Sequence, residues 1–299
     1  MDSFIPACAT SSKPKREAQD SIMVTCKRTK FMETYHRQNF SMPDSIIFYV
    51  AKNPKTAALY LKMVKTCKYF FVKNPIIVID RLVTYRGKWR VNEKPFDLTK
   101  YKCKYWITTK IYASAYESVD KNIFSPIIQK LYRCDAKSLS LHSQVVSFND
   151  LSLLISSAEK IYLNNVIVKK CDSIIQLENI IAIAVNAKSV AVSEPTITPK
   201  TMKELSKLPN FTKLDILALY NLSEVFDIDT FYGYMKKNQH TKIYITFDGQ
   251  ISDAFKNRLE TIVDEILETE QFNYKPPVIN FTGLDFEKYV KLCRIYHSH

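Results

Sequence analysis

The sequence predicts an α/β protein, a solenoid of strand–helix units preceded by a small helical module. Three observations predict this: a repeated apolar phrase, a helical pattern before it, and a change of charge between them. The phrase is two apolar residues separated by one residue, and its copies begin 22, 29, 27, 26 and 36 residues apart. Such a period is typical of stacked strand-plus-helix units that bury their apolar faces on one another. The copies are Leu139/Leu141, Ile161/Leu163, Val190/Val192, Leu217/Leu219, Ile243/Ile245 and Ile279/Phe281.

Residues 1–38 contain few large apolar residues and many Ser, Lys, Arg and Thr, which predicts a disordered basic tail. Lys15-Arg16 and Lys27-Arg28 have the spacing of a bipartite nuclear-import signal over 15–30, although a solvated run of charge gives the same pattern. The seven cysteines form no CxxC pair, which is typical of reduced thiols. We therefore expect a cytoplasmic or nuclear protein, or one in both compartments.

Residues 39–80 have the pattern of two or three short helices. Pro43 followed by Asp44 is typical of a helix start, and a second start follows at Asn53-Pro54. Lys73-Asn74-Pro75 ends the pattern. We expect a small helical module here.

Residues 81–134 are predicted to be mainly strands. Segments 83–90 and 100–108 alternate, with Gly87 as turn material. In Lys100–Trp106 lysines and aromatic residues alternate strictly, which would place them on opposite faces of one half-buried strand. Such a strand could not stack nucleic-acid bases beside its lysines, although basic and aromatic residues together leave nucleic-acid binding open as an alternative.

From residue 135 to 299 the repeated strands alternate with predicted helices. Asn149-Asp150 and Asp172 are positioned to cap the first two, and Pro199 and either Ser252 or Asp253 to begin the next two. The last helix would close the array as a terminal cap. The predicted helices cover residues 151–158, 173–185, 200–208, 254–267 and 284–296.

The charge changes where the repeat begins. Residues 1–135 contain 25 Lys and Arg against 11 Asp and Glu, whereas residues 136–299 contain 18 against 19. A basic front half therefore precedes a neutral array. We divide the chain into a tail (1–38), a helical module (39–80), a basic and aromatic strand region (81–134) and the array (135–299).

Known catalytic motifs are missing from the sequence. Four scattered glycines cannot form a phosphate-binding loop, and the five histidines show neither HExxH nor zinc-finger spacing. No uninterrupted apolar run reaches the roughly 18 residues that a membrane span needs. We expect no catalytic residue, no cofactor, no metal site and no membrane association. A Cys–His pair assembled from distant residues is left open by the sequence.

The helical module resembles an F-box, the motif by which substrate receptors bind the adaptor subunit of cullin-RING ubiquitin ligases. The resemblance covers about 40 residues: an opening Met42-Pro43, two apolar helices, and a close of the Cys-basic-x-aromatic type. It implies docking of a Skp-type adaptor. The docking residues that it assigns are Met42, Pro43, Ile46, Ile47, Val50, Leu61, Val64, Cys67, Lys68 and Phe70.

The repeats in 136–283 resemble irregular leucine-rich repeats, with Asn165 and Asn221 near the consensus asparagine. An F-box followed by such repeats is how one class of ligase substrate receptors is organised. Residues beside the phrase would point away from the core, and tyrosines among them supply contact area with a polar tip. The expected target-binding face contains His142, Tyr162, Asn164, Tyr220, Tyr244 and Asn280.

These patterns predict a non-enzymatic adaptor that holds a ligase core through 42–71 and a target protein, whose identity is open, through the array. One alternative is a nucleic-acid-associated protein that uses the basic strands of 81–135. Another is an interaction scaffold in which the helices are only the cap of the solenoid.

Overall fold

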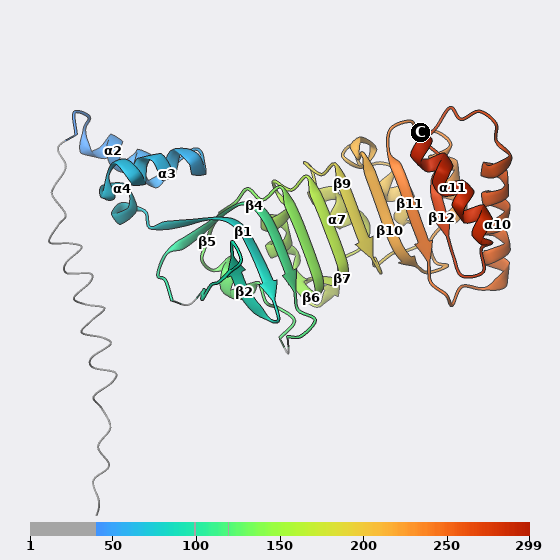
Figure 1. Cartoon of the computed structure of the whole chain (residues 1–299), viewed down its shortest axis with the longest axis horizontal. Coiled ribbons are helices and arrows are strands. Elements are labelled where there is room, and N and C mark those ends of the chain that lie inside the picture. The colour runs from blue at the N-terminus through green and yellow to red at the C-terminus, as the bar shows by residue number, and fades with distance from the viewer. Residues whose placement is uncertain (1–39, 99, 119) are drawn as a thin grey trace, which may run out of the picture. The chain divides into compact units, whose positions relative to one another are not determined.

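The computed structural model describes residues 40–98, 100–118 and 120–299 (Figure 1). The expected tail, 1–38, and its basic signal lie outside these residues. The chain forms two compact units, of which the first ends at Pro75 and the second is Ile76–His299. Within the described residues, no helix has the length and apolar character that crossing a membrane requires.

The first unit consists of three short helices. As predicted, Pro43 stands immediately before the first of them, and Asp44 lies in its first turn, where a carboxylate complements the helix dipole. The Thr56 hydroxyl caps the second by accepting a hydrogen bond from the Leu59 amide at 3.1 Å. The helices are α2 (Asp44–Lys52), α3 (Ala57–Thr66) and α4 (Lys68–Lys73).

Buried Asn74, which follows α4, connects the three helices. Its side-chain amide donates to the carbonyl oxygens of Ala51, at 3.0 Å, and Lys52, at 3.3 Å, at the end of α2. Its own carbonyl oxygen accepts from the hydroxyl of buried Tyr60, in α3, at 2.7 Å. These bonds satisfy polar groups inside a module that has little core of its own.

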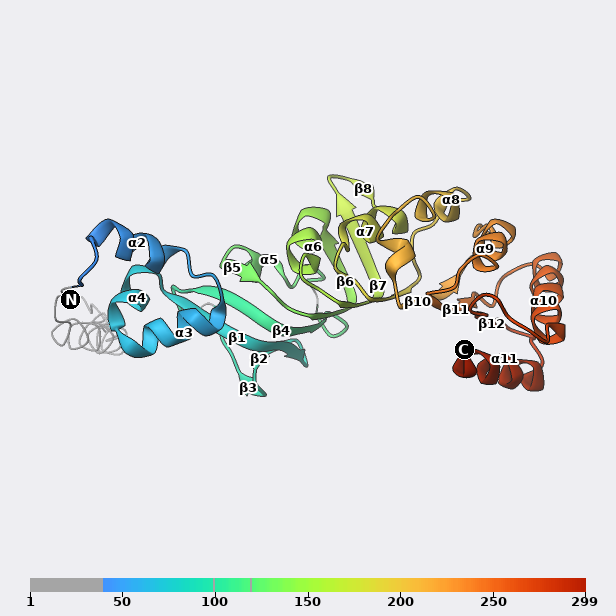
Figure 2. The same ribbon diagram turned by 90° about the horizontal axis from the view of Figure 1, so that it is seen from above.

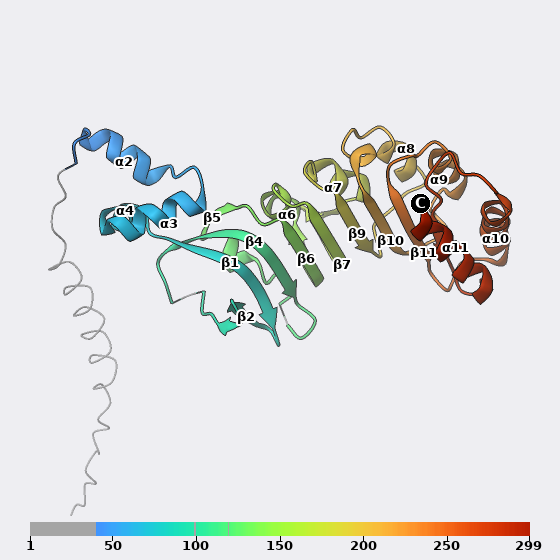
Figure 3. The ribbon, with the colours of Figure 1, turned by 45° about the horizontal axis from the view of Figure 1, so that its top comes forward.

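The second unit is built on one 12-stranded, mostly parallel sheet, ordered β12-β11-β10-β9-β7-β6-β4-β1-β2-β3 (Figure 3). β5 pairs with β4, and β8 with β7. The fold is therefore α/β, as predicted. The strands are β1 (Ile76–Tyr85), β2 (Lys88–Val91), β3 (Lys94–Pro95), β4 (Lys104–Ser114), β5 (Leu131–Cys134), β6 (Ser138–Ser147), β7 (Lys160–Lys170), β8 (Ser173–Ile174), β9 (Ser189–Ser193), β10 (Ile216–Leu222), β11 (Lys242–Phe247) and β12 (Val278–Asn280).

Helices α6 to α9 cover one face of this sheet, whereas α11 lies on the other (Figure 2). From β6 to β11, successive parallel strands are joined through α6, α7, α8 and α9, and β11 is joined to β12 through α10, so each connection brings the chain back to start the next strand in the same direction. The helices are α5 (Ser125–Ile128), α6 (Phe148–Ile155), α7 (Leu177–Ile183), α8 (Thr201–Leu205), the 3-10 helix η1 (Phe211–Lys213), α9 (Ile228–Met235), α10 (Asp253–Glu268) and α11 (Phe286–Ser298).

Five copies of the apolar phrase lie wholly in strands, the sixth begins in β12 and ends just after it at Phe281, and both residues of every copy are buried. The pattern therefore identified the core correctly. β1 and β4 carry weaker copies, Leu82/Thr84 and Ile111/Ala113, and Ile111 pairs in register with Leu82 on one side and Leu139 on the other. One sheet and one hydrophobic core thus run across residues 76–299, without a break at residue 135.

A left-handed residue recurs at one position of the repeat. The fourth residue after the start of the phrase has positive φ in five of six copies: 51° at Ser143, 50° at Asn165, 54° at Glu194, 55° at Asn221 and 103° at Gly283. Asparagine and glycine tolerate this conformation best, which explains why Asn165 and Asn221 stand at the near-consensus position. The repeat is therefore visible in the backbone as well as in the sequence.

Several predictions about strands and helices were wrong. Helix α6 begins at Phe148, and the Ser147 hydroxyl caps it in place of the predicted Asn149-Asp150. The strand predicted over 100–108 begins only at Lys104. Tyr105 and Trp106 are both fully buried, although they point to opposite faces of the strand. Trp106 is buried because Tyr132 covers it on the face away from the core. The 173–185 helix begins only at Leu177. The residues before it form β8, since Cys171, with φ of 53°, turns the chain back to pair along β7.

The last helix also differs from the prediction. It runs from Phe286 to Ser298, and the Asp285 carboxylate caps it by accepting from the Lys288 amide at 3.0 Å. It lies on the sheet face opposite α6 to α9 (Figure 2). Its amphipathic pattern predicted a buried face but not the partner of that face.

Candidate functional site

The helical module exposes large apolar side chains on one side of α2. Met42, Ile46, Tyr49 and Val50 recur at helical spacing and are 49%, 47%, 67% and 36% exposed. Ile47, at 3% exposed, and Ala51 occupy the opposite side and are buried within the chain. We call the first four residues the apolar helix surface.

The structure separates the predicted docking residues into three groups. Met42, Pro43, Ile46, Val50, Leu61 and Lys68 are exposed, whereas Val64, Cys67 and Phe70 are half-buried and Ile47 is buried. Phe70 forms part of an aromatic cluster with Phe40 and Tyr69. Sequence reasoning missed Tyr49, although its position three residues after Ile46 could have identified it.

The sheet face opposite α6 to α9 carries five of the six predicted target-binding residues close together. His142 lies between two tyrosines of the neighbouring strands, with ring centroids 4.9 Å from Tyr112 and 5.2 Å from Tyr162. Asn164 donates to the Tyr162 hydroxyl at 3.1 Å. Tyr220 and Tyr244 contact each other at 5.6 Å. Asn280 lies on β12, paired with Thr246 at the end of the sheet.

Helix α11 adds two further tyrosines to this face. The Tyr289 and Tyr244 hydroxyls are 3.3 Å apart, and the Lys242 ammonium donates to the Tyr296 carbonyl oxygen at 3.4 Å and lies over the Tyr296 ring. We call the combined set the tyrosine surface. It contains Tyr112, His142, Tyr162, Tyr220, Tyr244, Tyr289 and Tyr296.

Burial sets the protonation of this surface. Desolvation raises the pKa of Tyr220, and the neighbouring Tyr244 and Tyr162 raise it further. The hydrogen bond with Tyr244 raises the pKa of Tyr289. Desolvation lowers the pKa of His142. These shifts favour the uncharged forms of Tyr220, Tyr289 and His142, and the hydroxyl groups of the two tyrosines can donate and accept hydrogen bonds.

Sequence reasoning missed Tyr112, Tyr289 and Tyr296. Tyr112 lies between Ile111 and Ala113, a copy of the phrase that is hard to recognise because alanine is small. The α11 tyrosines gave no signal, since a helical pattern does not say which surface the helix contacts.

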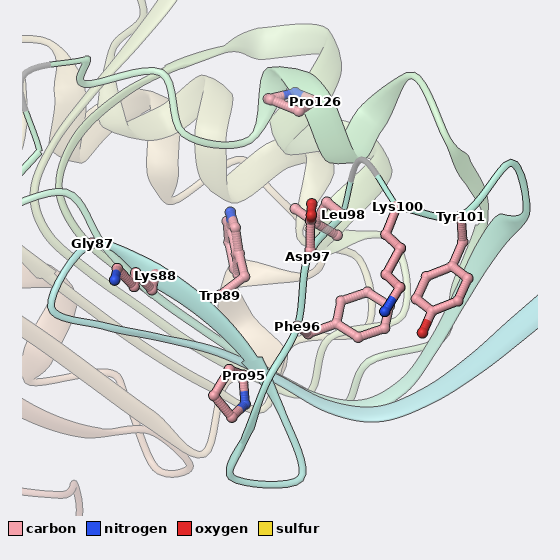
Figure 4. Close-up of a pocket in the computed structure, with 10 residues that line it drawn as sticks. All are labelled: Gly87, Lys88, Trp89, Pro95, Phe96, Asp97, Leu98, Lys100, Tyr101 and Pro126. Carbon is pink, nitrogen blue, oxygen red and sulfur yellow. The ribbon is translucent and has the colours of Figure 1, made fainter. Parts of the chain in front are cut away.

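A separate pocket of about 540 Å³ lies where β2 and β3 meet α5. Trp89, Pro95, Phe96, Tyr101 and Pro126 line it, and Figure 4 shows the Phe96 and Tyr101 rings side by side with the Lys100 chain beside them. The two rings are stacked with centroids 5.8 Å apart. Lys88 and Lys100 also line the pocket. Because Lys100 and Tyr101 precede the strand, strict alternation does not place them on opposite faces.

The described residues contain no group of three or more His, Cys, Asp or Glu side chains arranged to hold a metal ion. No family model, curated protein or solved structure matches the chain.

Proposed function

We propose that this chain is a non-enzymatic substrate-recognition adaptor of an SCF-type E3 ubiquitin ligase. In this proposal the first unit is an F-box-like module that docks a Skp-type adaptor through 42–71. The second unit is an irregular leucine-rich-repeat-like solenoid that binds a target protein. The observation that carries the proposal is the apolar helix surface, because it includes three of the residues to which the resemblance assigns docking.

Exposed apolar side chains on a small helical module favour a protein partner. Met42, Ile46 and Val50 leave 49%, 47% and 36% of their surface exposed after folding. Burying a fully exposed side chain of this kind is worth roughly 1.5–3 kcal/mol, and a partner would supply the part that belongs to the surface still exposed. Helix-in-groove recognition uses anchors at this spacing.

The second unit supports the proposal through its repeated geometry. Parallel strands place corresponding residues side by side, so the tyrosine surface is continuous over several units. Tyrosines are common in the most strongly binding parts of protein interfaces. A chain of this kind would supply proximity between ligase and target rather than chemistry.

The test is co-purification of the full-length chain with a Skp-type adaptor, beside an Ile46→Asp/Val50→Asp variant. Both side chains are exposed, so the substitutions leave the buried contacts of Ile47 and Ala51 in place. A Leu153→Asp/Ile174→Asp variant is the matched control, since these residues are 52% and 50% exposed in the second unit. We expect stoichiometric capture by the wild type and the control, and none by the first variant. Equal capture by all three chains, or by none of them, would refute adaptor docking.

The pocket at β2 and β3 favours a second candidate function, nucleic-acid binding. Aromatic rings beside Lys88 and Lys100 are arranged for base stacking and phosphate attraction. Binding of a fluorescent single-stranded oligonucleotide would then weaken steeply with salt and fall in a Lys100→Ala/Tyr101→Ala variant. Salt-independent binding, or binding that the variant retains, excludes this pocket as the site.

A further inference from the structure

We propose that the segment recognised by the second unit is acidic and extended, and that it lies across the strands between Lys110 and Lys242. The proposal deepens the target-binding half of the proposed function and rests on it. The juxtaposition behind it is a row of lysines next to the tyrosine surface on the same sheet face.

The face is basic because its outward positions carry no carboxylate. In each of β4, β6, β7, β9, β10 and β11, the residues before, between and after the two core residues of the phrase point away from the helices. None of these 18 described residues is Asp or Glu. Lys110, Lys160 and Lys242 are among them. Asp80, on β1, is paired with Arg81 at 3.8 Å, and Asp215, directly before β10, lies 3.1 Å from the His240 imidazole. Glu117 and Glu194 follow the C-terminal ends of β4 and β9.

The lysines on this face differ from those in the loops beside it. Lys137 and Lys188, just before their strands, both pair with Glu159, at 3.1 and 2.9 Å. Lys110 and Lys160 are exposed and have no ion-pair partner in the described part of the chain. Their charge is therefore available to a ligand. Lys242 contacts the Tyr296 carbonyl and ring, which leaves its charge uncompensated.

The register of the sheet sets the spacing of the acids. In the register of the sheet, Ser138 lies between Lys110 and Lys160 on the neighbouring strands. Ser189 and then Ile216 lie between Lys160 and Lys242. Strands about 4.8 Å apart place Lys110 about 10 Å from Lys160 and about 24 Å from Lys242. An extended peptide rises about 3.3 Å per residue, so about seven residues span the row. Side chains on one face of an extended peptide recur every two residues, so acids two or four residues and six or eight residues after a first acid would face the lysines.

The neighbouring row of side chains suits an extended backbone. Beside the lysine row, Tyr112 and Tyr162 alternate with Ser140, and Ala191 and Ala218 separate them from Tyr244. The small residues permit close approach of a peptide, and the rings offer contact for its uncharged side chains. Charge would fix the register, and the tyrosines would supply most of the buried area.

Selection from a random peptide library tests the proposal while the target protein is still unidentified. The full chain is incubated with random nine-residue peptides, beside a Lys110→Glu/Lys160→Glu variant. Lys203→Glu/Lys237→Glu is the matched control, because it makes the same change of charge on exposed lysines of the helix side. We expect Asp and Glu to be enriched among peptides bound by the wild type and the control. A selected peptide should bind the Lys110/Lys160 variant at least about tenfold more weakly.

Three results would overturn the proposal: a wild-type selection without acidic enrichment, an equal loss of binding in the control, and displacement of selected peptides by a single-stranded oligonucleotide or by anionic vesicles. The first would leave the tyrosine surface without an acidic ligand, the second would indicate a general effect of net charge, and the third would indicate a different anion. Adaptor capture by the wild type and by the Lys110/Lys160 variant is measured in parallel. Failure of the acidic-peptide proposal alone leaves this capture intact, whereas failure of the ligase assignment abolishes capture by both chains.

Discussion

Buried Asn74 links α2 and α3 of the helical module through its side-chain amide and its backbone carbonyl oxygen. Replacing it with alanine removes two hydrogen bonds and leaves the Ala51 and Lys52 carbonyl oxygens without this donor. We expect the local free energy of opening to fall by about 1–3 kcal/mol. Hydrogen exchange of residues 44–73 in the full chain should then accelerate by about 5- to 160-fold. Asn53→Ala is the control, because its exposed side chain bonds only the Tyr49 carbonyl oxygen; equal exchange in both variants would contradict the prediction.

His142 gives the tyrosine surface a pH dependence. Burial between two tyrosine rings lowers its pKa in the folded chain below the unfolded value of about 6.5. The unfolded chain therefore binds the proton more readily, and the contribution of neutral His142 to stability is lost as pH falls below about 6.5. Urea unfolding at pH 7.5 and 5.5 should show a larger acid loss for the wild type than for His142→Gln. Identical losses would show that the ring is not held neutral.

The repeat turn contributes stability through its backbone. Asn165, with φ of 50°, is exposed, so its conformation matters more than its contacts. Asn165→Val should lower the free energy of unfolding by about 1–2 kcal/mol, whereas Asn165→Gly should stay close to the wild type. Urea denaturation of both variants measures the difference. If valine is tolerated as well as glycine, the turn is not held in the left-handed region.

Among the secondary-structure elements, the sequence predicted best the strands whose two core residues are both large. Leu217/Leu219 and the other five copies were recognised in this way, but Thr84 and Ala113 weaken the copies in β1 and β4. The Lys100–Trp106 alternation misled because Trp106 is buried on the side where alternation assumes solvent. Its indole donates to Asp135 at 2.8 Å, a contact across 29 residues that no local pattern contains.

Residues of the candidate site, too, were predictable where a local pattern fixes them and unpredictable where a distant contact does. His142, Tyr162, Tyr220 and Tyr244 were predictable, because outward positions follow from the period of a strand. The arrival of Tyr289 and Tyr296 from α11 was not, since it depends on where a distant helix packs. The docking residues were predicted from resemblance alone. Only the structure separates exposed Ile46 from buried Ile47, and that difference decides which substitutions can test docking without disturbing the fold.

At the scale of the whole molecule, the change of charge and the change of packing fall at different places. Charge changes near residue 135, but the core is continuous from Ile79 to Leu292. Leu139 and Leu141 pair with Ile111 and Ala113 of β4, so the basic strands are part of the sheet that they precede. The packing boundary, after Pro75, therefore determines where the chain can be divided.

A chain of residues 76–299 should fold, and a chain of residues 136–299 should not fold stably. The shorter chain loses Ile79, Leu82, Ile107 and Ile111, each at most 1% exposed, and leaves β6 as an unprotected edge. Truncation of such residues costs about 2–5 kcal/mol each, so several losses exceed the stability of an ordinary domain. Circular dichroism with urea unfolding measures both chains. Unfolding of the 76–299 chain would favour the scaffold alternative, in which the helices are the cap of the array, because only a cap is required for the array to fold.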